Sequence, residues 1–277
     1  MLFEALPEIS EKELEHFFQI MLTKYGEDFR GYAPASLKRR LGTVLKRYGL
    51  PNMQTLNQRL LTQPEYYERF ISEITVSTTE LFRDPSAWVA LKNQLVPLFA
   101  SFPQVHIWHV GCSTGEEVLS VAILLQEMGL YDRTQIYATD IDRSALEQAQ
   151  KATYPLRHRE LYEKNLKAVL PNVPFSKYAW EEQGNLVFSP SLLRGVRFLR
   201  HNVVTESTFG KFEIILCRNL LIYLTPSLQD QVVTKLIRAL QAGGIFMIGT
   251  KESLFWCQAA QQLIPLNEVE RIYQKKP

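Results

Sequence analysis

The sequence lacks several features that define a protein class at once. Its three cysteines are far apart and odd in number, which argues against a disulfide framework and for reduced thiols. Its apolar runs are shorter than the roughly 20 residues that cross a bilayer. The first residues, MLFEALPEIS, have neither the basic nor the apolar segment of a signal peptide. We therefore expect a cytoplasmic protein that does not insert into a membrane.

Motifs for metal and nucleophile chemistry are also missing. The five histidines show no H-E-x-x-H pattern and no spacing with cysteine that suits zinc. Neither G-x-S-x-G nor G-K-[ST] occurs. The sequence predicts no metal site, and the chemistry must come from another set of residues.

Acidic residues are absent between Phe29 and Pro64, where seven basic residues occur although the whole chain has a net charge of only +2. Two pairs of these, Arg39 with Lys46 and Arg40 with Arg47, are seven residues apart. We expect them to share a helix face opposite an apolar stripe. Such a face suits an acidic partner, although a solvated surface is the simpler interpretation. Because no aromatic residues alternate with the basic ones, we expect no nucleic-acid partner.

The N-terminal part has the periodicity of helices. Leu37, Leu41, Val44, Leu45 and Tyr48 recur at i, i+4, i+7, i+8 and i+11. A glycine and a proline, in the sequence GLPN, then end the pattern. We predict a small all-α domain over residues 1–75.

The rest of the chain alternates between short apolar runs and helical segments. VHIWHV, QIYAT, FEIILC and GIFMIG are typical of buried parallel strands, with helices near 116–128, 143–151 and 226–241. This pattern predicts an α/β domain over residues 76–277 with a doubly wound, Rossmann-like sheet. A proline-rich segment at about residues 155–198 breaks the alternation. We predict that it forms an inserted antiparallel β-subdomain.

The stretch HVGCSTGEEVLSVA predicts a strand, a glycine turn and a helix. Gly111 and Gly115 lack the middle glycine that lets a backbone approach a pyrophosphate, because Ser113 stands there. Glu116 and Glu117 at the helix start also disfavour a phosphate. The acids suit S-adenosylmethionine, whose ammonium and ribose hydroxyls donate hydrogen bonds, while the helix N-terminus suits its carboxylate. Alternatively, the two glutamates only complement the helix dipole.

A second acidic feature follows the next predicted strand, in the sequence ATDID. An acid at this strand tip is where a ribose diol is held in doubly wound folds, and Asp140 and Asp142 are the two candidates. Asp142 is instead expected to be the N-cap of the helix that begins at Arg143.

Four stretches in this order, ITVSTTELFRDP, HVGCSTGEEVLSVA, ATDID and ILCRNLLIYL, together resemble the CheR family of chemotaxis receptor methyltransferases. The resemblance covers nearly the whole chain. It implies a class I methyltransferase that uses S-adenosylmethionine to esterify glutamates of chemoreceptors. Departures include Ser77, where the family usually has asparagine, and Thr250-Lys251 near the C-terminus. Methyltransferases of RNA or small molecules, and a non-catalytic S-adenosylmethionine-binding module, are the alternatives.

The resemblance assigns roles to residues by position. The cofactor contacts that it implies are Ser77, Thr79, Arg83, Glu117, Asp140, Asn202, Val203, Arg218 and Asn219. Arg83 and Tyr223 are expected beside the transferring methyl group, although an ion pair with Asp84 and core packing are the respective alternatives. The expected partner is the acidic methylation helix of a receptor's cytoplasmic domain, which would contact Arg39, Arg40, Lys46 and Arg47. In the family, the β-subdomain can also bind a receptor's C-terminal peptide.

Overall fold

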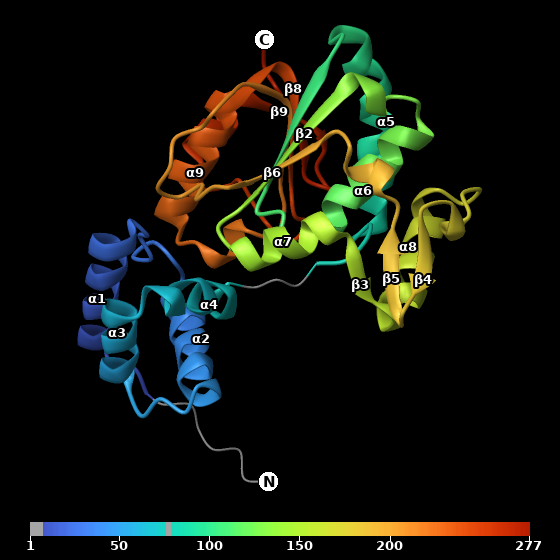
Figure 1. Cartoon of the computed structure of the whole chain (residues 1–277). Helices are drawn as coiled ribbons and strands as arrows, with labels where there is room; N and C mark the ends of the chain where they lie inside the picture. The colour runs from blue at the N-terminus through green and yellow to red at the C-terminus, as the bar shows by residue number, and fades with distance from the viewer. Residues whose placement is uncertain (1–7, 76–78) are drawn as a thin grey trace.

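The computed structural model describes residues 8–75 and 79–277. Its N-terminal part is a small bundle of helices, drawn in blue and cyan in Figure 1. The helices are α1 (Glu11–Ile20), α2 (Pro34–Arg47), α3 (Met53–Thr62) and α4 (Pro64–Ile74), and a short π-helix over Met21–Tyr25 follows α1.

Local sequence signals explain where these helices begin. Ser10 and Glu13 form a reciprocal capping box at the start of α1, and Asn52 accepts from the backbone of Thr55 at α3. Prolines occupy the first turns of α2 and α4, where the missing N–H has no helical partner to lose. The leucines and valine of the predicted α2 stripe are buried in the core of this bundle.

The second part is built on a mixed seven-stranded sheet with the order β6-β2-β1-β7-β8-β10-β9. Its strands are β1 (Val105–Val110), β2 (Thr134–Asp140), β6 (Val196–Arg200), β7 (Phe212–Cys217), β8 (Leu240–Ile248), β9 (Leu263–Asn267) and β10 (Ile272–Lys275). The strands β6, β2, β1, β7 and β8 run parallel, and β10 pairs antiparallel with β8 and β9. The predicted doubly wound α/β fold is confirmed.

Alternate residues of the central strands enter two separate cores, one on each face of the sheet. In β1, Ile107 belongs to the core beneath α5 (Pro85–Ser101) and α6 (Glu116–Glu127), whereas Trp108 belongs to the core beneath α9 (Pro226–Ala239). Figure 1 shows α9 on one side of the sheet and α5 and α6 on the other. Because the sheet is covered on both faces, the ends of its strands are where a ligand can reach it.

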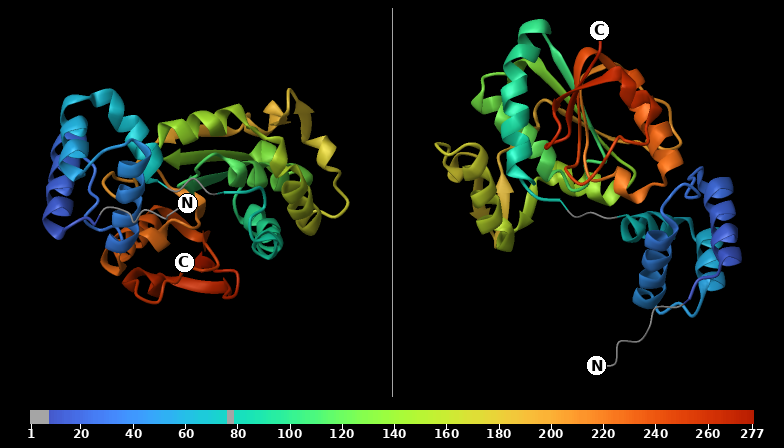
Figure 2. Two further views of the ribbon diagram at one scale, coloured as in Figure 1. Left: turned by 90° about the horizontal axis from the view of Figure 1, so that it is seen from below. Right: turned by 180° about the vertical axis from the view of Figure 1, so that it is seen from behind.

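A separate three-stranded antiparallel sheet projects from the large domain, as both views in Figure 2 show. It consists of β3 (Thr153–Pro155), β4 (Ala179–Glu182) and β5 (Asn185–Phe188), and α8 (Arg159–Val169) lies between β3 and β4 in the chain. The range of about 155–198 expected for this insert includes the start of β6. That strand instead pairs with β2 at the edge of the large sheet.

Candidate active site

The glycine turn after β1 requires its glycines for steric reasons. Gly111 and Gly115 have φ of 67° and 92°, in the left-handed region. A Cβ on Gly111 would lie 2.6 Å from Leu220 Cδ1, and one on Gly115 would lie 2.7 Å from Ala149 Cβ. The turn is therefore pressed against the segment after β7 and against α7 (Arg143–Lys151). These contacts hold the N-terminus of α6 at the carboxyl edge of the sheet.

The two acids at the tip of β2 have different tasks. Asp140 accepts from the backbone N–H of Ser113 at 2.8 Å and from that of Asp142 at 3.0 Å. Burial raises the pKa of Asp140 above its ordinary value. Asp142 is buried and caps α7 by accepting from the N–H of Ser144 at 2.9 Å, as the alternative for this residue predicted. Of the two acids, Asp140 is thus the remaining candidate for binding a ribose diol at the strand tip.

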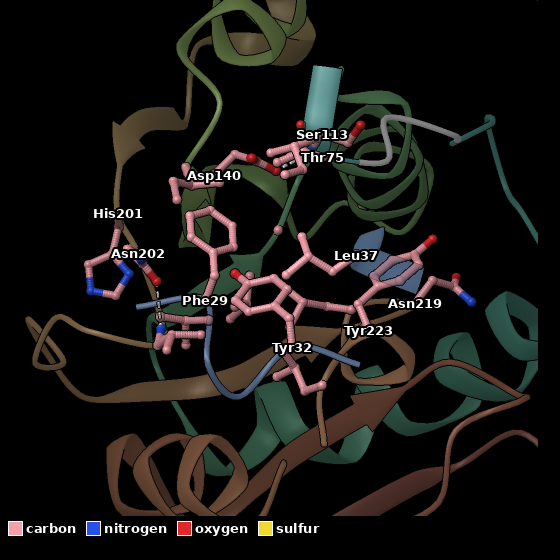
Figure 3. A pocket seen from close by; sticks show the side chains of 18 of the residues that line it. Phe29, Tyr32, Leu37, Thr75, Ser113, Asp140, His201, Asn202, Asn219 and Tyr223 are labelled. Atoms are coloured by element: carbon pink, nitrogen blue, oxygen red, sulfur yellow. Dashed lines mark hydrogen bonds between the residues drawn. The ribbon is translucent and has the colours of Figure 1, made fainter. Parts of the chain in front are cut away.

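A pocket lies where this edge of the sheet meets the helical domain (Figure 3). Four residues expected at the cofactor, and the expected catalytic Tyr223, line it together: Asp140, Asn202, Val203, Asn219 and Tyr223. The helical domain forms the facing wall with Phe29, Tyr32, Leu37, Arg40, Ile74 and Thr75. Sequence reasoning missed this wall, because its residues lie in several short segments with no motif.

Backbone hydrogen bonds fasten the helical domain at this pocket. The N–H of Ala33 donates to the carbonyl of Tyr223 at 2.9 Å, and that of Thr225 donates to the carbonyl of Gly31 at 2.8 Å. Gly31 packs against Leu228, where a Cβ would approach to 2.4 Å. The segment that carries Tyr223 is therefore held directly by the helical domain.

Arg40 does not lie where the sequence analysis placed it. Its half-buried guanidinium lies 4.4 Å from the centroid of the Tyr223 ring and donates to the carbonyl of Ile74 at 2.8 Å. Burial lowers the pKa of Arg40. The expected position on the exposed face is wrong, because Arg40 follows Leu37 by three residues and precedes Val44 by four. This spacing places it beside the apolar stripe, about 60° around the helix from Leu37.

The other residues of the predicted basic face differ in their exposure and in their ion pairs. Arg39 and Lys46 are exposed on α2. Arg47 forms an ion pair with Glu73 of α4. The basic segment is thus partly neutralised by an acid from another helix, which sequence order alone did not reveal.

Glu117 and Arg218 form a buried ion pair beside the glycine turn. The guanidinium of Arg218, whose side chain is fully buried, also donates to Asp84 at 2.8 Å and to the carbonyl of Arg83 at 3.1 Å. Burial lowers the pKa of Arg218 to about 10. The cluster joins α6, the end of β7 and the segment before α5, so it fixes three elements around the turn.

Glu116 has a different environment from Glu117. Its carboxylate is buried and accepts from the hydroxyls of Thr114 at 2.7 Å and Tyr162 at 3.0 Å. Burial raises the pKa of Glu116. The two glutamates therefore do more than complement the helix dipole, because each has its own buried partners.

Arg83 lies on a constrained turn rather than in the pocket wall. Phe82 and Asp84 on either side have φ of 49° and 55°, conformations that cost about 1–3 kcal/mol each outside glycine. The N–H of Phe82 donates to Ser120 Oγ of α6 at 2.7 Å. Ser77 lies outside the described residues, and the roles of Thr79 and Arg83 stay predictions.

Several buried polar atoms around the turn and the pocket have no hydrogen-bond partner among the described residues. They are Thr79 Oγ1, Ser113 Oγ, Asn219 Oδ1, Arg218 Nε, and Nε and Nη2 of Arg40. Buried polar groups are normally paired, so this set indicates a ligand with both donors and acceptors. An amino acid joined to a nucleoside, as in S-adenosylmethionine, has both kinds of group.

The doubly wound sheet, the glycine turn and the acid at the tip of β2 are those of a class I methyltransferase that uses S-adenosylmethionine. Two family models match almost the entire chain. One is described as "CheR methyltransferase, all-alpha domain" and matches residues 12–75. The other, "CheR methyltransferase, SAM binding domain", matches residues 77–269. The chain belongs to the CheR methyltransferase family.

Similar proteins come from several bacteria. The chain is 35% identical to a protein named "Putative methyltransferase Cher3" from Pseudomonas putida, over 95% of this chain and 96% of that protein. It is 28% identical to the "Chemotaxis protein methyltransferase" of Listeria innocua, with 88% of this chain and 91% of that protein covered. For the "Chemotaxis protein methyltransferase 1" of Vibrio cholerae the identity is 26%, with 89% and 90% covered.

The described part of the chain contains neither a membrane-spanning helix nor a cluster of metal ligands. None of the helices within residues 8–75 and 79–277 is long and apolar enough to cross a bilayer. In the same residues, no group of three or more histidine, cysteine, aspartate or glutamate side chains is arranged to hold a metal ion.

Proposed function

We propose that this enzyme transfers the methyl group of S-adenosylmethionine to glutamate carboxylates of chemoreceptor cytoplasmic domains, in the cytoplasm. The observation that carries the proposal is the Arg40 guanidinium in the pocket. It lies over the Tyr223 ring, and two of its nitrogens have no hydrogen-bond partner among the described residues. A planar cation with unused N–H groups suits a carboxylate. The names of the Listeria and Vibrio relatives support a role in chemotaxis.

In this proposal the cofactor lies along the carboxyl edge of the sheet. Asp140 accepts from the ribose hydroxyls. Val203 and Asn202 form the wall beside the adenine base, and Asn219 lies beside the sulfur that carries the methyl group. Glu117, held by Arg218, accepts from the ammonium of the amino acid. Thr79 and Arg83 approach from the segment before α5, and the contact predicted for Ser77 falls outside the described residues. The unpaired atoms of Thr79, Ser113 and Asn219 support this placement.

The reaction needs orientation more than proton transfer. The ordinary pKa of a solvated glutamate side chain is about 4.3, so the carboxyl group is ionised at pH 7 and no general base is required. Bound S-adenosylmethionine supplies a methyl group on a cationic sulfur. Arg40 holds the incoming carboxylate in the pocket, the Tyr223 hydroxyl sets its angle, and the role predicted for Arg83 is to approach the carboxylate from the turn before α5. Positioning of this kind contributes about 7–11 kcal/mol in well-aligned reactions.

The function is tested by incubating the enzyme with labelled S-adenosylmethionine and soluble cytoplasmic fragments of chemoreceptors. A methyl group that is released by base identifies a carboxyl ester. Fragments in which the methylated glutamates are replaced by alanine serve as the control. Binding of the cofactor without transfer to any fragment would contradict the proposed substrate.

The acid at the tip of β2 gives the first prediction. Asp140→Ala should weaken S-adenosylmethionine binding by more than about 1 kcal/mol, because it removes a charge-assisted acceptor. Asp142→Ala is a matched control two residues away that should lower stability through loss of the α7 cap but leave affinity unchanged. Calorimetric titration of both folded variants checks this. Equal affinities for Asp140→Ala and the wild type would refute the placement of the cofactor.

The exposed part of the basic face gives the second prediction. Arg39→Ala/Lys46→Ala should raise KM for the receptor fragment, and the wild-type rate should fall with salt as attraction is screened over about 8 Å at physiological ionic strength. Lys164→Ala/Lys167→Ala removes the same charge from exposed positions of α8 and should leave KM unchanged. If the two double variants have the same KM at low salt, the face is only a solvated surface.

A second docking mode stays a prediction. The strand β4 lies at an edge of the three-stranded sheet, and an extended receptor peptide can add to such an edge through main-chain hydrogen bonds. Its side chains Glu181 and Glu182 are exposed, so a peptide that binds here should be basic or neutral at the facing positions.

A further inference from the structure

A buried carboxylate joins the helical domain to the cofactor pocket. Glu27, in the helical domain, is only 3% exposed. Its Oε1 accepts from the hydroxyl of Tyr67 at 2.9 Å and from Nη2 of Arg200 at 2.5 Å, while its Oε2 accepts from Nδ2 of Asn202. Tyr67 belongs to α4, whereas Arg200 and Asn202 belong to the large domain. One carboxylate therefore connects both domains through three donors.

Asn202 cannot turn without losing hydrogen bonds. Its Oδ1 accepts from the N–H of Val204 at 2.8 Å, the dashed line at Asn202 in Figure 3. It also accepts from the N–H of Thr205 at 3.4 Å, so its amide nitrogen faces Glu27. Lys235 of α9 holds the same loop from the other side by donating to the carbonyl of Val203 at 2.7 Å. Because Asn202 and Val203 line the pocket, the shape of this wall depends on Glu27.

A carboxylate in this position needs all of its donors. Burying an ionised group without partners is costly, and here two of the three donors come from the large domain. Separation of the domains would leave Glu27 with Tyr67 alone and would release the amide of Asn202. The amide nitrogen of Asn202 is therefore held only while the helical domain is docked, whereas its Oδ1 keeps its bonds to Val204 and Thr205.

We propose that Glu27 is a positioning residue for cofactor binding, which fixes Asn202 and so makes the affinity for S-adenosylmethionine depend on docking of the helical domain. The inference rests on the placement of the cofactor in the pocket that Asp140 and Asn202 line. It assigns to the helical domain a task at the cofactor, in addition to the proposed recognition of the substrate.

The geometry of the three hydrogen bonds permits a selective test with Glu27→Gln. The glutamine Oε1 can still accept from Tyr67 and Arg200, whereas its amide nitrogen would face the amide nitrogen of Asn202. The hydrogen bond to Asn202 is lost, two donors then oppose each other, and the ion pair with Arg200 becomes a hydrogen bond to a neutral amide. We expect the dissociation constant for S-adenosylmethionine to rise roughly tenfold or more, the effect of leaving a buried donor unsatisfied.

The matched control is Glu68→Gln. Glu68 of α4 pairs with Arg143 of α7 at 3.3 Å, so this pair also joins the two domains, but neither residue lines the pocket. We expect wild-type affinity for Glu68→Gln. An equal loss in both variants would show that domain contact in general, and not Glu27, determines the affinity.

A reversed pair provides the rescue. Asn202→Asp alone places a carboxylate against Oε2 of Glu27 and should weaken binding. In Glu27→Gln/Asn202→Asp, the glutamine amide donates to the aspartate, which still accepts from Val204 and Thr205. We expect this double variant to bind S-adenosylmethionine more tightly than Asn202→Asp alone, since the hydrogen bond between the two side chains is restored.

Calorimetric titration with S-adenosylmethionine, well below each variant's unfolding temperature, gives the answer. Wild-type affinity in folded Glu27→Gln, or a double variant no better than Asn202→Asp, overturns the proposal. If Glu27→Gln does not fold, the comparison of Asn202→Asp with the double variant decides. Asp140→Ala, measured in parallel, separates the two levels: weak binding there with wild-type affinity in Glu27→Gln refutes only the role of Glu27.

Discussion

Arg218→Met should destabilise the protein by about 3–5 kcal/mol, the cost of removing one partner from a buried ion pair. The methionine keeps much of the volume of the arginine stem but leaves Glu117 buried without its cation and removes the donor to Asp84. Because Glu117 lies in the first turn of α6, the glycine turn loses its anchor as well. We therefore expect S-adenosylmethionine binding to weaken together with stability. Denaturant unfolding and calorimetric titration measure the two effects.

A double variant shows whether the uncompensated charge causes this loss. Glu117→Gln in the Arg218→Met background removes the buried charge, and replacing both partners of a buried pair is often close to neutral for stability. We expect Arg218→Met/Glu117→Gln to regain a large part of the lost free energy of unfolding but not the cofactor affinity. If the free energy of unfolding of Arg218→Met is within about 1 kcal/mol of that of the wild type, the ion pair does not stabilise the fold.

The central strands were predictable because they are buried on both faces. VHIWHV and FEIILC are continuous apolar runs, and they became β1 and β7 in the middle of the sheet. β6 escaped prediction as part of the large sheet because its sequence VRFLR alternates, as expected for an edge strand with one exposed face. β10 has three half-exposed residues and offers an equally weak signal.

Site residues were predictable where a motif lies at a strand end, and not where the site is formed by distant contacts. Asp140 ends a buried strand, and this position in the sequence was sufficient to predict that it lines the pocket. Glu27 has no such signal, because its partners Tyr67 and Arg200 are 40 and 173 residues away in sequence. The charge of Arg40 suggests an exposed position, but its helical angle places it beside the apolar stripe of α2. Its spacing from Leu37 was sufficient to predict partial burial.

Arg40→Ala should lower kcat/KM for receptor methylation by roughly 100-fold or more, because the carboxylate loses the cation that binds it and orients it toward the methyl group. The stack on Tyr223 holds the guanidinium in the pocket, so its fork is oriented before the substrate arrives. Arg40→Lys should not restore activity, because an ammonium can neither stack in the same way nor bind a carboxylate with two parallel bonds. Tyr223→Phe keeps the ring under Arg40 and separates stacking from the role of the hydroxyl.

The comparison that identifies the task of Arg40 is between turnover and cofactor affinity. If Arg40 holds the substrate carboxylate, Arg40→Ala should lose activity while its dissociation constant for S-adenosylmethionine stays within about twofold of the wild type. Arg39→Ala removes the same charge from the adjacent exposed position and should retain kcat. Equal losses of turnover and cofactor affinity in Arg40→Ala would instead make Arg40 a ligand of the cofactor, and the carboxylate would then have to be held by Arg83.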